Sequence, residues 1–249
     1  MEPWHLVALL FSGLVAGSVA NAIAMVLIVQ RVAPKPDQCI SCAHWPGPRP
    51  RLPILGVLMA SPCPECGRTR SRWPILTELA LAVIFVALYL RFGPSPTTLA
   101  YALYAWVLAV AFVTDVLCRR IFDWLTYPSS IIALTLAFLL PEAVLAPGSG
   151  PIGAIAGGIL AGGLLGLIWL IGRIMYPRQV AIGIGDIKLA IFIGLITGGS
   201  HALSSILIGV LLGGVVALVV ILRGRSARQA IPYGPNLILG ALITILTTN

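Results

Sequence analysis

Residues 6–29 read LVALLFSGLVAGSVANAIAMVLIV, a run of 24 residues without a single charged side chain. A helix of about 20 apolar residues is long enough to cross a lipid bilayer. Comparable uncharged runs recur along the chain, at 92–114, 124–141, 143–172 and 229–249. A membrane barrel would need short segments of alternating polarity, which the sequence lacks. These runs therefore predict an all-α polytopic membrane protein.

The composition of the whole chain agrees with this interpretation. Of its 249 residues, 59% are apolar and 10% are charged, and the mean hydropathy is +1.01. Soluble domains carry about 25% charged residues, so a single soluble globule is excluded. The net charge of +8 would suggest nucleic acid in a soluble protein. Here we expect the charge to set membrane topology, with the lipid bilayer and not nucleic acid as the partner.

Pro, Gly and Arg residues between the runs predict about eight transmembrane helices. The first is expected to be retained, because no Lys or Arg precedes it and it is too long for a signal peptide. The sixth span is short and rich in Gly, so it either crosses fully or forms a partial helix. The expected spans are 5–29, 74–91, 98–116, 124–141, 152–173, 187–199, 203–222 and 232–248.

The distribution of Lys and Arg predicts the orientation. If the N-terminus lies outside, the cytoplasmic segments and adjoining helix ends hold 15 of the 16 basic residues. The positive-inside rule then places both termini outside and the large polar loop in the cytoplasm. Three regions are expected: a first helix over 1–29, a cytoplasmic lobe over 30–73 and a membrane-embedded domain over 74–249.

The predicted lobe contains two CxxC pairs, Cys39 with Cys42 and Cys63 with Cys66, separated by twenty residues. This spacing is typical of a structural zinc site with four thiolate ligands. The alternative is a pair of redox disulfides, but thiols stay reduced in the cytosol. A segment with many Pro residues and little to bury needs such a staple. We therefore predict a zinc-binding lobe between the first two membrane helices.

Carboxylates near membrane depth are costly and so are functional candidates. Four qualify here, namely Glu78, Asp115, Asp123 and Asp186. The topology places Asp115, at the end of the third span, and Asp186, at the start of the sixth, at the same cytoplasmic edge. Two carboxylates sharing a proton are the working parts of an aspartic protease, one activating water and the other protonating the scissile carbonyl.

The alternative is that each acid only pairs with a nearby base. Arg119 is four residues after Asp115, and Lys188 and Arg178 are close to Asp186 in sequence. Both interpretations stay open at this point, because the residues alone do not decide between such pairs and the dyad.

Taken in order, the motifs resemble those of the bacterial type IV prepilin peptidases, a family of intramembrane aspartic proteases. The resemblance covers nearly the whole chain. Its matching stretches are GSVAN at 17–21, the two CxxC pairs, PILTEL at 74–79, Asp115 to Asp123 followed by Thr126 and Pro128, GIGDIKL at 183–189 and PYGP at 232–235.

The resemblance implies a membrane endopeptidase that removes the short basic leader of prepilins or pseudopilins, in type IV pilus or type II secretion systems. It implies a bacterial inner membrane location, with Asp115 and Asp186 catalytic at the cytoplasmic face. Many members also methylate the new N-terminus with S-adenosylmethionine. The alternatives are a peptidase without methyltransferase activity and a non-enzymatic membrane carrier or assembly subunit.

Other motif residues have a structural interpretation beside the functional one. Gly183 and Gly185 either let an extended substrate approach or only break the helix. Lys188, in the same motif, is also expected to support the catalytic site. Asp123 either attracts the basic leader or caps the fourth helix, and the cap is favoured. Asn21 and Glu78 are candidates for contacts to S-adenosylmethionine, although the helix dipole alone favours a Glu near a helix start.

Overall fold

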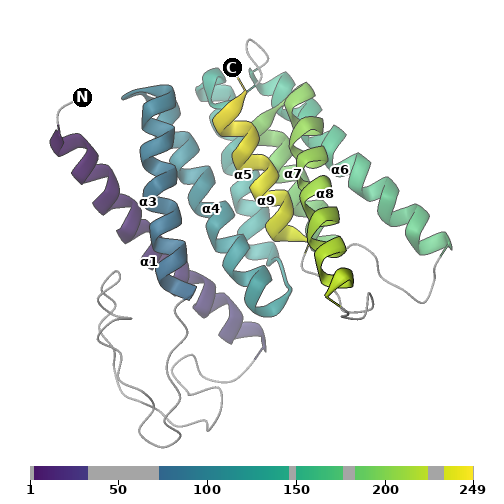
Figure 1. Cartoon of the computed structure of the whole chain (residues 1–249). Coiled ribbons are helices and arrows are strands. Elements are labelled where there is room, and N and C mark those ends of the chain that lie inside the picture. Colours follow the sequence, from purple (N-terminus) through teal and green to yellow (C-terminus); the bar gives the residue numbers. More distant parts are fainter. Residues whose placement is uncertain (1–2, 33–72, 146–149, 176–182, 224–232, 249) are drawn as a thin grey trace, which may run out of the picture. The chain divides into compact units, whose positions relative to one another are not determined.

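A computed structural model describes residues 3–32, 73–145, 150–175, 183–223 and 233–248 (Figure 1). Within these ranges the regular structure is helical and contains no strand, which confirms the all-α prediction. The elements are α1 (Pro3–Val32), α3 (Trp73–Phe92), α4 (Pro96–Cys118), α5 (Asp123–Leu139), the 3-10 helix η1 (Pro141–Ala143), α6 (Gly150–Met175), α7 (Ile184–Thr197), α8 (Gly199–Leu222) and α9 (Gly234–Thr247).

Each of the eight predicted spans overlaps one of these α-helices. The ends differ from prediction by up to four residues, most clearly where α8 begins at Gly199 and not at 203. The sixth helix also begins early, at Ile184, so that Asp186 and Lys188 lie near its start. Residues 33–72 of the predicted lobe, with all four CxxC cysteines, fall outside the described residues, whereas 30–32 belong to α1 and Trp73 begins α3.

Five helices of the described ranges are long and apolar enough to cross a membrane, namely α1, α3, α4, α6 and α8. The other three are shorter, with 17 residues in α5 and 14 each in α7 and α9. At 1.5 Å per residue, a 14-residue helix is about 21 Å long, less than the hydrocarbon thickness of about 30 Å. The structure thus agrees with a polytopic membrane protein, and eight full crossings stay a prediction.

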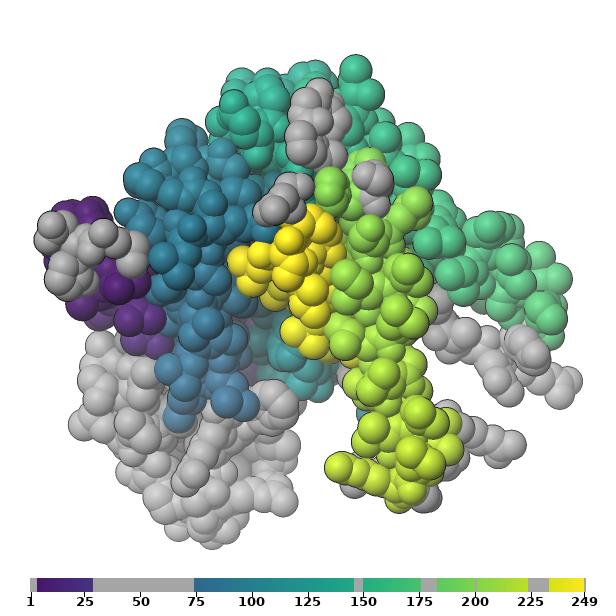
Figure 2. Space-filling model, turned by 45° about the horizontal axis from the view of Figure 1, so that its top comes forward, coloured from purple at the N-terminus to yellow at the C-terminus, as the bar shows by residue number. Residues whose placement is uncertain are grey.

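Large apolar side chains remain exposed along α8, as expected for a surface in contact with lipid. Leu207, Leu211, Val215 and Leu218 follow each other at helical spacing and are each more than half exposed. Figure 2 shows α8 in green at the surface, with α9 in yellow packed against it. The side of α8 that meets α9 carries Gly209 and Gly213 instead.

The chain divides into two compact units, and the first contains α1, α3 and the 105–114 part of α4. α1 and α3 pack closely because small residues of α1 face α3. A Cβ on Gly13 would overlap the backbone of Ala82, and one on Gly17 would meet Glu78. Small residues at such interfaces let membrane helices approach.

The second unit contains residues 95–104 and 115–249, and α7 is its centre. α7 packs against α5, α6, α8 and α9, and its residues from Leu189 to Thr197 are buried apart from Ile191. Tyr104 of α4 meets Phe192 edge-on, with ring centroids 6.1 Å apart. The surrounding helices therefore fix α7, and with it the segment that carries Asp186.

The closest helix crossing in this unit joins α6 and α7 at Gly157 and Gly194. A Cβ on either glycine would overlap the backbone carbonyl of the other. We expect Gly194→Ala to destabilise the protein by about 1–3 kcal/mol, because overpacking forces the backbones apart. Gly163→Ala on α6 is the matched control, since open space surrounds that position. Thermal unfolding in detergent would contradict this packing if both variants melted at the wild-type temperature.

Candidate active site

Asp115 lies in the last turn of α4, where the chain leaves the helix. Arg119 follows in the left-handed conformation, with φ 55°, and its N–H donates to the carbonyl of Asp115 (2.8 Å). The side chain of Asp115 is 5% exposed. Its Oδ2 is buried without a well-aligned donor in the part of the chain that the structure describes, and the backbone N–H of Gly234 acts on the same carboxylate. A buried polar atom left in this way calls for an explanation, and a reacting group at this carboxylate would supply one.

Asp186 lies in the first turn of α7, directly after the GIG segment. Its Oδ2 accepts the N–H of Gly183 (3.0 Å), and its own N–H donates to the Gly183 carbonyl (3.1 Å). A carboxylate is favourable in the first turn because it satisfies free N–H groups and the helix dipole. The helix start thus fixes the orientation of this side chain.

Asp186 and Arg119 are both near enough for their charges to act on the carboxyl group of Asp115. The alternative pairs are not formed where they are described. No ion pair joins Asp115 to Arg119 within the described ranges, and Lys188 pairs with Asp123 instead of Asp186. Arg178 lies outside those ranges.

Gly183 and Gly185 both lie in tight surroundings. A Cβ on Gly183 would lie 3.2 Å from Oδ2 of Asp186, and one on Gly185 would lie 3.2 Å from Cβ of Ile121. Ile121 belongs to the segment between α4 and α5. The second glycine therefore lets the start of α7 lie against the residues that follow Asp115.

The start of α9 completes the site, in a role that the sequence alone does not predict. Gly234, the first residue of α9, is buried beside Asp115. A Cβ at Gly234 would lie 2.7 Å from Oδ2 of Asp115 and 3.4 Å from Cδ1 of Ile121. The charge of Asp186 also acts on the neighbouring Tyr233. The PYGP motif is the available signal, but its contact with Asp115 depends on how distant helices pack.

Asp123 does not cap α5, so the predicted cap is wrong. The cap position is occupied by Phe122, without a side-chain hydrogen bond, and Asp123 is the first helical residue. Its carboxylate forms an ion pair with Lys188 of α7. A partner 65 residues away in sequence thus takes the side chain that a local pattern assigned to the cap.

Asn21 and Glu78 lie in the first unit and hold α1 against α3. Oγ of Ser18 donates to Oε1 of Glu78 (2.6 Å), and Nδ2 of Asn21 donates to the carbonyl of Pro74 (3.1 Å). Glu78 is 3% exposed. These contacts favour the structural interpretation of both residues over contact with S-adenosylmethionine.

Metal ligation has no candidate in the parts of the chain described here. These parts hold no group of three or more His, Cys, Asp and Glu side chains that could bind a metal ion. The predicted zinc ligands, Cys39, Cys42, Cys63 and Cys66, lie in 33–72, outside them. The described site therefore offers two carboxylates, one of them with a buried oxygen, which suits acid and base catalysis of hydrolysis.

Comparison with known proteins covers most of the chain. Residues 102–218 match the type IV leader peptidase family, and residues 11–92 match the bacterial peptidase A24 N-terminal domain. Asp115 and Asp186 fall in the first match, and Asn21, Glu78 and the CxxC cysteines fall in the second. No solved structure matches the chain.

Three curated relatives are each named prepilin leader peptidase/N-methyltransferase. The protein of Bacillus subtilis is 28% identical, over 86% of this chain and 82% of its own. That of Legionella pneumophila is 26% identical, over 98% and 92% respectively. That of Pseudomonas putida is 26% identical, over 84% and 71%. These names indicate an enzyme and do not support the non-enzymatic carrier.

Proposed function

Because the chain belongs to the type IV leader peptidase family, we propose that it is an aspartic endopeptidase that removes the basic leader of prepilins or pseudopilins. The observation that supports the proposal is that Asp186, 71 residues from Asp115 in sequence, is near enough for its charge to act on Asp115, which lies beside Gly234. One carboxylate, ionised, takes a proton from the attacking water. The other, protonated, donates to the scissile carbonyl as the tetrahedral intermediate forms.

The proposal includes the membrane context. The basic residues predict which helix ends face the cytoplasm of a bacterial inner membrane. These are the end of α4 with Asp115, the start of α5 with Asp123, and the start of α7. A prepilin carries its leader on that side, followed by an apolar helix. The peptide bond of a membrane helix has to be unwound before hydrolysis, since the helix buries its carbonyls. A site at the membrane edge meets the leader where such unwinding is least costly.

The experiment that tests the proposal uses the full-length protein in detergent or liposomes and a purified type IV prepilin. We expect a product that lacks the leader, identified by its mass, and no product in the absence of the enzyme. A prepilin that stayed intact with well-folded enzyme, at several enzyme concentrations, would contradict the proposal.

N-methylation of the new N-terminus is the second candidate activity, favoured by the names of all three relatives. The same reaction with S-adenosylmethionine added separates it from a monofunctional peptidase. A bifunctional enzyme yields a mature pilin heavier by one methyl group, and a monofunctional one yields the same mass with and without the cofactor. Asn21 and Glu78 are not proposed as cofactor contacts, because they hold α1 against α3.

We also propose that the lobe over 30–73 is a separate region stabilised by zinc, as the two CxxC pairs predict. The purified protein should contain about one zinc per chain, measured by elemental analysis. Cys63→Ser should lose the metal and expose the lobe to proteolysis, because three thiolates hold zinc less tightly than four. A variant that kept both its zinc and its protease resistance would overturn the assignment.

A further inference from the structure

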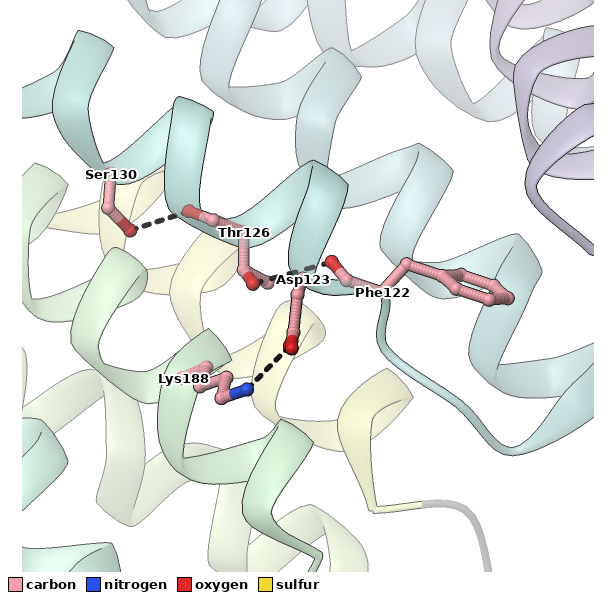
Figure 3. Close-up of polar contacts among 5 residues, drawn as sticks. All are labelled: Phe122, Asp123, Thr126, Ser130 and Lys188. Carbon is pink, nitrogen blue, oxygen red and sulfur yellow. Dashed lines mark hydrogen bonds and ion pairs between the residues drawn. The ribbon is translucent and has the colours of Figure 1, made fainter. Parts of the chain in front are cut away.

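Lys188 lies two residues after Asp186, and its side chain points toward Asp123 of α5 (Figure 3). Its Nζ forms an ion pair with Oδ1 of Asp123 (Figure 3). The ammonium also lies 4.9 Å from the centre of the Tyr127 ring, within the range of a cation–π contact. The start of α7 is thus connected to the first turn of α5 through Lys188.

A second contact joins the same two segments through Gly185, the residue that precedes Asp186. Gly185 packs against Ile121, which lies two residues before Asp123. Asp186 is therefore flanked by two attachments to the chain that leaves Asp115. The segment carrying Ile121 and Asp123 is itself anchored, because Phe122 is buried and its carbonyl accepts the N–H groups of Leu125 and Thr126.

We propose that Asp123 and Lys188 are positioning residues, whose ion pair fixes the first turn of α7 so that Asp186 is held in register with Asp115. This inference rests on the proposed peptidase function, and it assigns the pair a role in the geometry of the dyad. Misplacement of a catalytic group by about 1 Å can lower a rate by about 100-fold. A contact next to Asp186 therefore has more influence on turnover than its small contribution to stability suggests.

The contacts favour this role over binding of a basic leader. Lys188 already neutralises the charge of Asp123, so a leader would have to displace an intramolecular partner. The two functions predict different kinetics. A positioning pair affects kcat, because it acts on the dyad in the enzyme–substrate complex, whereas a leader-binding Asp123 affects KM.

The test measures kcat and KM on a full-length, membrane-inserted type IV prepilin for Asp123→Asn, Lys188→Gln and the double variant. We expect kcat to fall about tenfold in each single variant while KM changes by less than about twofold. The double variant should be no slower than either single variant, because both substitutions break the same pair. Lys188→Arg should recover much of the rate, since it keeps the charge that Asp123 requires.

Glu142→Gln is the matched control, an exposed acid beyond the other end of α5, and it should retain wild-type kinetics. Melting temperatures of all variants should stay close to wild type, because exposed ion pairs contribute little to stability. A kcat loss that only followed the loss of folded protein would overturn the proposal. So would unchanged kcat in both single variants, or a raised KM in Asp123→Asn together with a lowered KM in Lys188→Gln.

The outcome is separable from that of the proposed function. Cleavage by wild type and its loss in Asp186→Asn would support the aspartic peptidase whatever the Asp123 and Lys188 variants do. If wild type did not cleave any prepilin, the peptidase proposal itself would fail.

Discussion

Asp186→Asn is expected to abolish prepilin cleavage while the helices remain folded. Asn keeps the size of the side chain and an oxygen that accepts the Gly183 N–H, so the start of α7 is preserved. It removes the carboxyl group that the reaction needs as acid or base, a loss of about 10²–10⁴-fold in rate. Product formation should be measured by mass spectrometry on the same prepilin, with Glu142→Gln as the control.

Asp115→Asn should have the same effect for a related reason. Its carboxyl group is buried, so the neutral amide avoids the cost of burying a charge, and stability should not fall. Because the proposed mechanism needs both carboxyl groups with one shared proton, the double variant should be no worse than either single one. Cleavage at the wild-type rate by either Asn variant would exclude the aspartic mechanism.

The shared proton also predicts how the wild-type rate depends on pH. Cleavage should fall on the acid side, where both carboxyl groups are protonated, and on the alkaline side, where both are ionised. A cleavage rate that stayed constant from the acid to the alkaline side would argue against a shared proton.

Much of the fold follows from the sequence because membrane helices must satisfy every backbone group internally. The apolar runs, together with the Pro, Gly and Arg residues between them, predict a span at each of the eight α-helices of the described chain. They do not reveal the early start of α7, because the charge of Asp186 interrupts the apolar run after the helix has begun. In the structure Asp186 lies in the first helical turn, where an acid is favoured. A charged residue therefore does not mark the boundary of an apolar helix when it lies in the first helical turn.

That Asp115 and Asp186 act as a pair stays a prediction, made from the number of crossings between them. The partner of Asp123 could not be predicted, because local rules cannot identify a residue in α7. The same holds for Gly234, which the PYGP motif marks without indicating its neighbour. The contact with Asp115 depends on how α9 packs, and small residues such as Gly209 and Gly240 set that packing.

Gly234 offers the most direct test of the packing around the dyad. Ala at this position would put its Cβ 2.7 Å from Oδ2 of Asp115. Ile121 restricts movement on another side, with Cδ1 3.4 Å from the same Cβ. The new methyl group must therefore turn the carboxylate of Asp115 or shift the start of α9. Either adjustment changes the distance between the two acids, where about 1 Å can cost 100-fold in rate.

We therefore expect Gly234→Ala to lower kcat for prepilin cleavage about 100-fold, while the protein stays folded in detergent. Gly214→Ala on α8 is the matched control, because a Cβ added at Gly214 would meet nothing within 4 Å in the described chain. The control should cleave at the wild-type rate and melt at or above the wild-type temperature, since Ala favours a helix over Gly. If Gly234→Ala cleaved as fast as Gly214→Ala, Asp115 would tolerate displacement, and close contact between α9 and the dyad would not be needed for catalysis.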